Sequence, residues 1–283
     1  MLRAYNTPYL RRQCLLCCKQ ATYARKKEAY SMRIAALYDI HGNLPALNAV
    51  LEELEQVRPD VVVIGGDMVS GPMPRQTLER LGQLGNRVCS LRGNADREVV
   101  AAFDDQPFVQ RMPEEVREVT RWTAQQLGRS QRDFLAQLPD QITLHVEGLG
   151  DVLFCHATPR SDEEIFTPIT PQERLNTIFT GIEQQLVVCG HTHMQFERRV
   201  GSVRIVNAGS VGMPYADRPG AYWLLVGPEG SEFRRTEYDV ETAAQQVRES
   251  GYPQAQDFAG ENVLKVPSAA EATEIFEHMT MEK

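Results

Sequence analysis

The chain has 283 residues, of which 42% are hydrophobic and 24% charged, a composition typical of soluble globular proteins with one large domain or two small ones. Its formal net charge is −8. Residues 1–31 hold seven Lys or Arg residues against one acid, so the rest of the chain is more acidic still. The acidic character of residues 32–283 excludes a large nucleic-acid-binding surface, because such a surface needs many basic side chains. No run approaches the ~18 apolar residues of a membrane span, so we expect no membrane contact.

Residues 1–31 differ in character from the rest of the chain, because they are basic and lack clear periodicity. Three interpretations compete: a start codon assigned too early, with Met32 as the true start; a targeting peptide, since such peptides are rich in Arg and poor in acids; and a disordered basic arm. We favour the first, and predict that residues 1–31 lie outside a single domain that spans 32–283.

The cysteines favour a reducing compartment. Cys89, Cys155 and Cys189 lie in apolar, strand-like runs, where a free Cys behaves as a small hydrophobic residue. Disulfide frameworks belong to oxidising compartments. We therefore expect a cytoplasmic protein.

The first third of the chain predicts repeated units of strand, polar turn and helix. Apolar strands are expected within 33–38, 60–67 and 87–91, and helices within 45–54 and 74–84. Each of the three strands ends in Asp or Asn beside Gly. In open α/β sheets, ligands bind at the carboxyl ends of the strands, so these polar residues predict a site along one sheet edge.

The segment 98–138 interrupts this alternation of strands and helices. It is polar and predicts two helices, at 114–127 and 131–138, which we interpret as a helical cap or insertion near the site. Its amphipathic character also makes it a candidate surface for a homo-oligomer.

The pattern of strands resumes after this segment and ends in helices. The remaining strands are expected at 142–146, 151–155, 186–188, 203–206, 221–226 and 232–238, and the remaining helices at 171–179, 240–249 and 269–279, so that 240–283 forms a helical C-terminal part.

Seven potential metal ligands each follow an apolar run. They are Asp39, His41, Asp67, Asn94, His156, His191 and His193. Side chains two residues apart in extended backbone point to the same side, so His191 and His193 form a natural clamp. A mixture of imidazole and carboxylate favours Mn, Fe, Zn or Ni over Ca. For any one of these residues a capping or turn role is a reasonable alternative.

Seven ligands are too many for one tetrahedral ion and suit two divalent ions that share a carboxylate. Two such ions clamp the attacking and leaving oxygens of an in-line displacement, and a water that bridges them supplies hydroxide near neutral pH. The sequence thus predicts a two-metal hydrolase.

These same motifs resemble the calcineurin-like metallophosphoesterase superfamily. They are DIHGN (39–43), GGD (65–67), GNAD (93–96), the single His156 after a strand, and GHTH (190–193). The NAGSVG turn (207–212) is most similar to the small bacterial and archaeal phosphodiesterases of that superfamily. The resemblance covers about 32–238. It implies an α/β fold, a four-layer α/β/β/α sandwich, and a small phosphate ester as substrate.

The resemblance also implies a division of the ligands between two ions. Asp39, His41 and His193 would hold one ion, Asn94, His156 and His191 would hold the other, and Asp67 would bridge them. We expect Asp67, Asn94 and His156 to serve catalysis through the positioning of metal and phosphate.

One departure from the family pattern bears on the chemistry. Relatives usually carry His where this chain has Ala95, and that His is thought to help the leaving group. A general acid contributes about 10²–10⁴-fold, so we expect slower turnover and a bias toward good leaving groups. Asp96, the expected partner of that His, can instead cap the following helix. Asn43, Arg92 and Ser210 are candidates for contacts behind the ligands or with phosphate, with a turn role as the alternative.

Three functions remain open at this point. A metal-dependent phosphodiesterase fits the full ligand set best. A phosphomonoesterase, acting on nucleotides or proteins, is the alternative within the enzymes, because the motif contacts only the phosphoryl group. A non-catalytic scaffold is the third, since the retromer subunit of eukaryotes resembles the same superfamily and Ala95 points that way.

Overall fold

The computed structural model describes residues 32–109 and 112–281. The prediction about residues 1–31 lies outside the described part. Within that part, no helix is long and apolar enough to cross a membrane.

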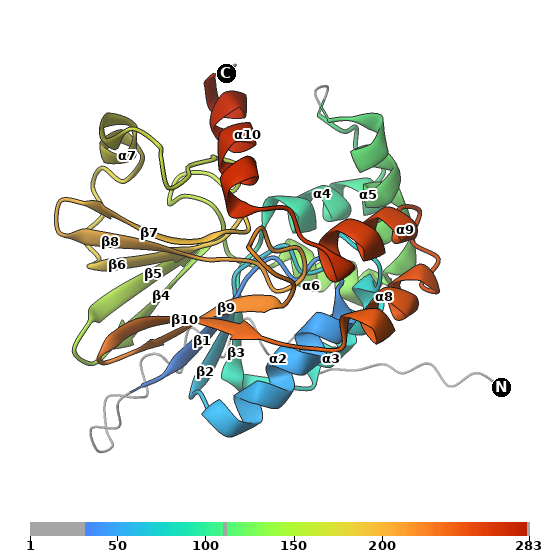
Figure 1. Cartoon of the computed structure of the whole chain (residues 1–283), viewed down its shortest axis with the longest axis horizontal. Coiled ribbons are helices and arrows are strands. Elements are labelled where there is room, and N and C mark those ends of the chain that lie inside the picture. Colours follow the sequence, from blue (N-terminus) through green and yellow to red (C-terminus); the bar gives the residue numbers. More distant parts are fainter. Residues whose placement is uncertain (1–31, 110–111, 282–283) are drawn as a thin grey trace.

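Two five-stranded sheets form the centre of the molecule (Figure 1). The first sheet has the order β10 (Gly230–Thr236), β9 (Ala221–Gly227), β1 (Ile34–Leu37), β2 (Val61–Ile64) and β3 (Val88–Ser90). The second has the order β4 (Gln141–Val146), β5 (Gly150–Cys155), β6 (Leu186–Cys189), β8 (Val203–Ala208) and β7 (Gln195–Val200).

Each sheet contains three neighbouring parallel strands. In the first sheet β1, β2 and β3 are parallel, with Ile34 opposite Val61. In the second sheet β5, β6 and β8 are parallel. The other strands pair antiparallel, and β9 lies against β1. The carboxyl ends of parallel neighbours meet at one edge, which is where ligand-bearing turns gather.

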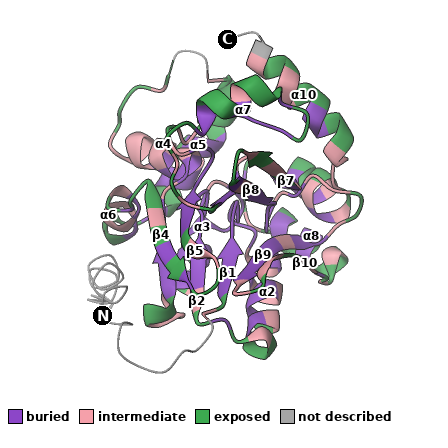
Figure 2. Cartoon of the chain, turned by 90° about the vertical axis from the view of Figure 1, so that its left-hand side faces the viewer, coloured by how far each residue is buried: buried purple, intermediate pink, exposed green. Residues whose placement is uncertain are grey.

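The alternation of side chains along β1 explains why it is buried on both faces. Ala35 and Leu37 join the core on the outer face of the first sheet, while Ile34 and Ala36 join the core between the sheets. All four residues of β1 are fully buried, as expected of a parallel strand covered on both sides. Strand β1 is accordingly purple in the burial view (Figure 2).

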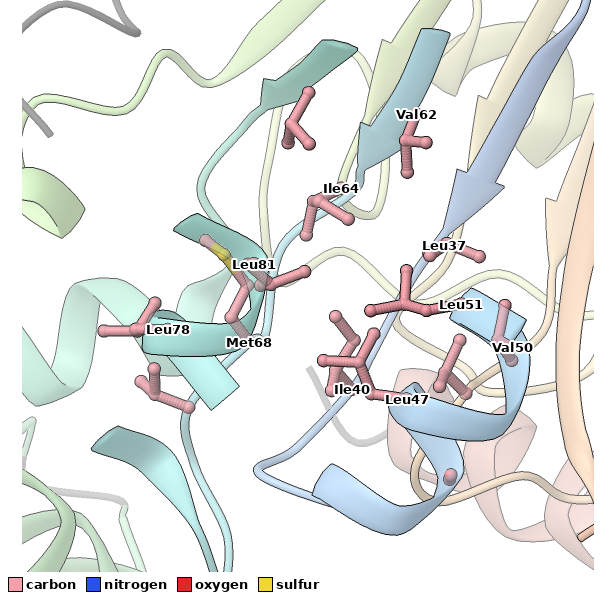
Figure 3. Close-up of a cluster of buried hydrophobic side chains, with 14 of the residues drawn as sticks. Leu37, Ile40, Leu47, Val50, Leu51, Val62, Ile64, Met68, Leu78 and Leu81 are labelled. Carbon is pink, nitrogen blue, oxygen red and sulfur yellow. The ribbon is translucent and has the colours of Figure 1, made fainter. Parts of the chain in front are cut away.

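Helices cover the outer face of the first sheet. They are α2 (Leu44–Val57), α3 (Pro74–Gly82), α4 (Asn94–Phe103), α5 (Glu114–Gln126) and α6 (Arg129–Ala136). Figure 3 shows Leu51 of α2 beside Leu37, at the end of β1, and Leu47 of the same helix beside Ile40. The spacing of the apolar residues of α2 at three and four positions places them on this one face. The segment 98–138 thus contributes Val99, Ala124 and Leu135 to the same core.

The outer face of the second sheet carries α7 (Gln172–Ile178) and α10 (Ala269–Met281). The remaining helices α8 (Val240–Arg248), α9 (Ala255–Phe258) and the π-helical η2 (Ala259–Leu264) pack in a separate cluster with Val119 of α5. The short 3-10 helix η1 (Gly85–Arg87) precedes β3. The layers run helix, sheet, sheet, helix, so the predicted α/β/β/α sandwich is confirmed.

Three elements differ from the sequence prediction. Strand β7 was not expected, because its alternation is blurred by charged residues: Glu197 is exposed and only Phe196 is buried. Charges of this kind are usual at a sheet edge, and β7 is an edge strand. Helix α4 begins already at Asn94. The segment 255–264 is helical and was missed, although its buried residues Ala255, Phe258, Ala259 and Val263 recur at helical spacing.

Candidate metal centre

The seven predicted ligands lie at one edge of the two sheets. Asp39 and His41 follow β1, Asp67 follows β2, and Asn94 opens α4 after β3. From the second sheet, His156 follows β5, and the pair His191 and His193 follows β6. The site therefore forms where the carboxyl ends of strands from both sheets converge.

The first group of ligands is Asp39, His41 and His193. One ligand atom of each lies within 4.8 Å of the others. Nε2 of His41 is 3.1 Å from Nε2 of His193, and the latter atom is 3.4 Å from Oδ1 of Asp39. Two imidazole nitrogens and a carboxylate oxygen thus face a common point.

The second group is Asp67, His156 and His191, which also place one ligand atom each within 4.8 Å of one another. Asn94 joins it: the amide atom that faces the site is 3.1 Å from Nε2 of His156 and 3.1 Å from Nδ1 of His191. An amide oxygen in that place completes a cation site, whereas hydrogen bonding alone favours the amide NH₂ there.

Asp67 lies between the two groups. Its Oδ2 is 3.7 Å from Nε2 of His41 in the first group and 3.4 Å from Nε2 of His156 in the second. Its Oδ1 accepts a hydrogen bond from the backbone N–H of Ala95 at 2.8 Å. One carboxylate oxygen is therefore fixed, and the other faces both groups.

Backbone carbonyls orient three of the rings. The contacts are Nδ1 of His41 to the oxygen of Ser70 (3.0 Å), Nδ1 of His193 to Met213 (2.8 Å) and Nδ1 of His156 to Gly65 (2.9 Å). A carbonyl only accepts, so each Nδ1 carries a proton, and Nε2 is the nitrogen that faces the centre and is left to coordinate an ion. This arrangement is the usual support for a metal-ligating histidine.

One atom of the first group indicates that cations belong here. Oδ1 of Asp39 is buried and has no hydrogen-bond partner within the described residues. The nearest imidazole nitrogens are 3.4 to 3.9 Å away, too far for a good hydrogen bond. A buried carboxylate oxygen without a partner is costly, and a divalent cation among the three ligands removes that cost. The donor set fits such ions.

The backbone of the site is locally strained. Asp39, His41, Asp67, His191 and His193 all have positive φ, between 47° and 68°. In residues 32–109 and 112–281 only two other non-glycine residues share this conformation. Non-glycine residues rarely adopt it, and it persists where the surroundings enforce it, often at functional sites.

A model of the calcineurin-like phosphoesterase superfamily domain matches residues 32–227. The chain belongs to this superfamily. It is a metallophosphoesterase, a class of enzyme that hydrolyses phosphoric esters with the help of metal ions.

Individual relatives agree with this assignment. Phosphodiesterase YfcE of Escherichia coli (strain K12) is 28% identical over 203 residues, which is 69% of this chain and 87% of the relative. An uncharacterized protein of Methanocaldococcus jannaschii is 26% identical over 244 residues, covering 78% and 94% of the two chains. The structure of a metallophosphoesterase from Sphaerobacter thermophilus matches 83% of this chain and 100% of its own, with a TM-score of 0.64 and 26% identity. A hypothetical protein of Pyrococcus horikoshii shares the fold, with a TM-score of 0.70, 22% identity and the same coverage.

Burial and mutual charge set the protonation of the metallophosphoesterase centre before ions bind. Burial alone would raise the pKa of Asp67, but His156 and His41 bring it well below its usual range. Burial lowers the pKa of His156, but the charge of Asp67 and its hydrogen bond to the imidazole raise it by more, so that the pKa of His156 is about 10. Burial, together with the charge of His156, lowers the pKa of His191 to about 4. His156 and Asp67 thus form a charged pair without metal.

Asn43 and Ser210 act on the backbone around the ligands. Oδ1 of Asn43 accepts from the N–H of Ala46 at 3.2 Å, and its Nδ2 donates to the carbonyl of Gly212 at 2.9 Å. The hydroxyl of Ser210 donates to the carbonyl of Asp39 at 2.7 Å. Both side chains are buried and support the turn that carries the first ligands.

The other two candidates lie on the α4 side of the centre. Asp96 accepts from the N–H groups of Gly93 (3.2 Å) and Met68 (3.0 Å), and so caps α4. Its burial, together with the charge of Asp67, raises its pKa to about 7. Arg92 donates to Oδ1 of Asp140 at 2.6 Å and lines a cavity beside the centre.

Three neighbours of the centre were not singled out from the sequence. The ring of Tyr215 stacks on that of His193, with the ring centroids 5.4 Å apart. The sequence around Tyr215 has no pattern that predicts this contact. Asn207 donates to the carbonyl of Gly190 at 2.6 Å and so fixes the turn that carries His191 and His193. Its place in the NAGSVG motif was the sequence feature from which this role could have been predicted. Glu98 lies one helical turn after Asn94, and burial raises its pKa to about 7, with the charge of Asp67 adding to the shift.

Proposed function

We propose that this metallophosphoesterase hydrolyses phosphodiesters of small molecules with two divalent cations. Asp67 carries the proposal, because its Oδ2 faces one imidazole of each ligand group, at 3.7 Å and 3.4 Å. The relative YfcE is named a phosphodiesterase, which supports the preference for diesters. Mn, Fe, Zn and Ni all suit the donor set.

The proposed ligand assignment follows the two groups. Asp39, His41 and His193 would hold one ion, Asn94, His156 and His191 the other, and Asp67 both. When bound, two such ions polarise the phosphoryl oxygens and lower the pKa of a water between them, so that hydroxide is available for in-line attack near neutral pH.

The chain's own residues position this chemistry. The carbonyls behind His41, His156 and His193 hold the three rings, so the ligand geometry is set before substrate arrives. At position 95 this chain has Ala in place of the histidine that usually helps the leaving group. We therefore propose a preference for diesters whose leaving alcohol is acidic, because such an alcohol departs without that help.

The proposal is tested by comparing bis-p-nitrophenyl phosphate with p-nitrophenyl phosphate. The full-length protein is stripped of metal and then assayed with Mn²⁺, Ni²⁺, Zn²⁺ or Mg²⁺, beside the variant Asp67→Asn. We expect metal-dependent cleavage of the diester in the wild type. In Asp67→Asn we expect kcat to fall by about 10²-fold or more, since one shared ligand loses its charge.

Two results would change the conclusion. A clear preference for p-nitrophenyl phosphate would make the chain a phosphomonoesterase. Diester cleavage that survives both chelation and Asp67→Asn would rule out the two-metal mechanism.

A further inference from the structure

A polar cavity of about 290 Å³ adjoins the second ligand group. His156 lines this cavity as well as the metal centre, so the two are continuous. Three arginines also line it: Arg92, Arg97 and Arg160. Its volume is at the lower end of small-molecule pockets, which begin near 300 Å³, so it suits one compact polar group and the atoms that connect it to the centre.

Two of the three arginines already form ion pairs with carboxylates, and these pairs stabilise the wall of the cavity. Arg97 pairs with Asp162 through Nε at 2.8 Å and Nη2 at 3.3 Å, and also with Glu163. Arg160 pairs with Glu164, and its Nη1 donates to the carbonyl of Thr177. Their charge is therefore matched by carboxylates of the same loop.

Arg92 differs, because most of its donors are unused. Within the described residues only its Nη2 has a partner, Oδ1 of Asp140, and its buried Nε has none. A guanidinium offers five N–H donors. The side chain of Asp140 is 71% exposed, and such surface ion pairs are weak. Arg92 can therefore engage a second acceptor in the cavity.

We propose that this cavity is a subsite for a second phosphate group of the substrate, bound by Arg92. The inference rests on the proposed phosphodiesterase function, since the subsite extends from the same centre. A guanidinium group binds a phosphate through bidentate, charge-assisted hydrogen bonds. The substrate is then a diester that carries a further phosphate on the arm that remains next to the second ligand group, as in a nucleoside bisphosphate ester.

A matched pair of chromogenic probes tests the subsite. Thymidine 5′-(p-nitrophenyl phosphate) is compared with the same ester carrying an additional 3′-phosphate, on the full-length protein with Mn²⁺. We expect kcat/KM to favour the phosphorylated probe by about tenfold or more, the usual range for hydrogen bonds to charged groups. In Arg92→Gln this ratio should fall toward one. Arg129→Gln, which removes an exposed arginine of α6 that is paired with Asp133 and does not line the cavity, should keep the wild-type ratio.

A second variant and a binding measurement keep the test independent of folding and of turnover. Asp140→Ala removes the acceptor of Arg92, and we expect the preference for the phosphorylated probe to persist or rise. By calorimetry with Mn²⁺ present, thymidine 3′,5′-bisphosphate should bind about tenfold more tightly than thymidine 5′-monophosphate, and less so in Arg92→Gln.

The outcomes separate the two claims. Cleavage of both probes at equal efficiency would overturn the subsite and leave the phosphodiesterase proposal intact, as would a preference that Arg92→Gln leaves unchanged. If neither probe is cleaved, the phosphodiesterase proposal fails, and the calorimetric comparison alone decides whether Arg92 binds a second phosphate.

Discussion

At the scale of single residues, the centre depends on close approach between backbone and ligand. Gly93 lies directly beside Asp67, and a Cβ at position 93 would be 2.1 Å from Oδ1 of Asp67. Tyr38 fills the space beneath Gly65 in the same manner, with its hydroxyl donating to the carbonyl of Val188. The glycines of the motifs therefore make room for the side chains that present the ligands.

The variant Gly93→Ala should lose metal binding and stability together. The added methyl must displace the Asp67 carboxylate or the backbone beneath it, at a cost of about 1–3 kcal/mol. Metal content and urea denaturation measure the two effects. Gly82→Ala is the control, because nothing lies within 4 Å of the place that its added methyl group would occupy, and we expect it to be neutral or slightly stabilising. Full metal content in Gly93→Ala would contradict the tight contact.

Metal binding should release a proton at pH 7. His156 has its pKa raised to about 10 in the metal-free centre, so it is charged at neutral pH and must lose its proton to coordinate an ion. Its pairing with Asp67 stabilises the metal-free protein fully below about pH 6.5, the ordinary pKa of histidine, and this stabilisation is lost as the pH rises through about 10. Calorimetry in two buffers of different ionisation enthalpy detects the proton. A binding heat that does not depend on the buffer would contradict the charged pair.

The ligands could be predicted from sequence because each follows a short apolar run, where a strand end is the simplest interpretation. Tyr215 could not be predicted, since its contact with His193 joins the ligand turn to a segment with no pattern of its own. Arg92 was predicted as a candidate for phosphate contact, but its unused donors are visible only once Asp140 and the neighbouring cavity are placed.

At the scale of elements, helix α2 is held to the turn that follows β8. Asn43 bonds both the first turn of α2 and the carbonyl of Gly212, and the hydroxyl of Ser210 reaches back to Asp39. The helix itself follows from its period of 3.6 and from Pro45, but the link to a turn far along the chain carries no local signal. Similarly, β7 pairs with β8 although its charged residues blur the alternation expected of a strand.

Removing this link should cost more than the loss of an ordinary helix cap. In Asn43→Ala, the first turn of α2 and the carbonyl of Gly212 both lose a partner, and we expect a loss of about 1–3 kcal/mol in the free energy of unfolding. Chemical denaturation measures it. Asn48→Ala in the same helix removes one partly buried bond to Arg80 and should cost less than about 1 kcal/mol. Equal costs for the two variants would argue against the link.

At the scale of the whole molecule, the centre joins the two sheets, because each ligand group draws on both. Asp39 and His41 come from the first sheet and meet His193 from the second, and Asp67 meets His156 in the same way. The family resemblance implied the layers, but sequence patterns did not determine how the sheets face each other. That arrangement depends on the shared core, to which Tyr38 and Phe154 contribute from opposite sheets.

Chelation should therefore lower the stability of the entire fold. A ligand at 100 times its Kd stabilises the native state by about 2.7 kcal/mol, which for a domain of this size is a Tm shift of roughly 5–10 °C. Calorimetric melting with Mn²⁺ and with EDTA measures the shift. Asp67→Asn should show a much smaller difference, and an equal shift in both proteins would indicate that the ions bind elsewhere.

The strand order has a consequence for the synthesis of this protein on the ribosome. Strand β1 is made first, yet its neighbour β9 is made only after the entire second sheet. Until then, one edge of β1 lacks its antiparallel partner, and its wholly apolar sequence presents free backbone groups to other chains. The nascent protein is thus most exposed to aggregation late in translation, and chaperone binding would be concentrated in that interval, before residues 221–227 close the sheet.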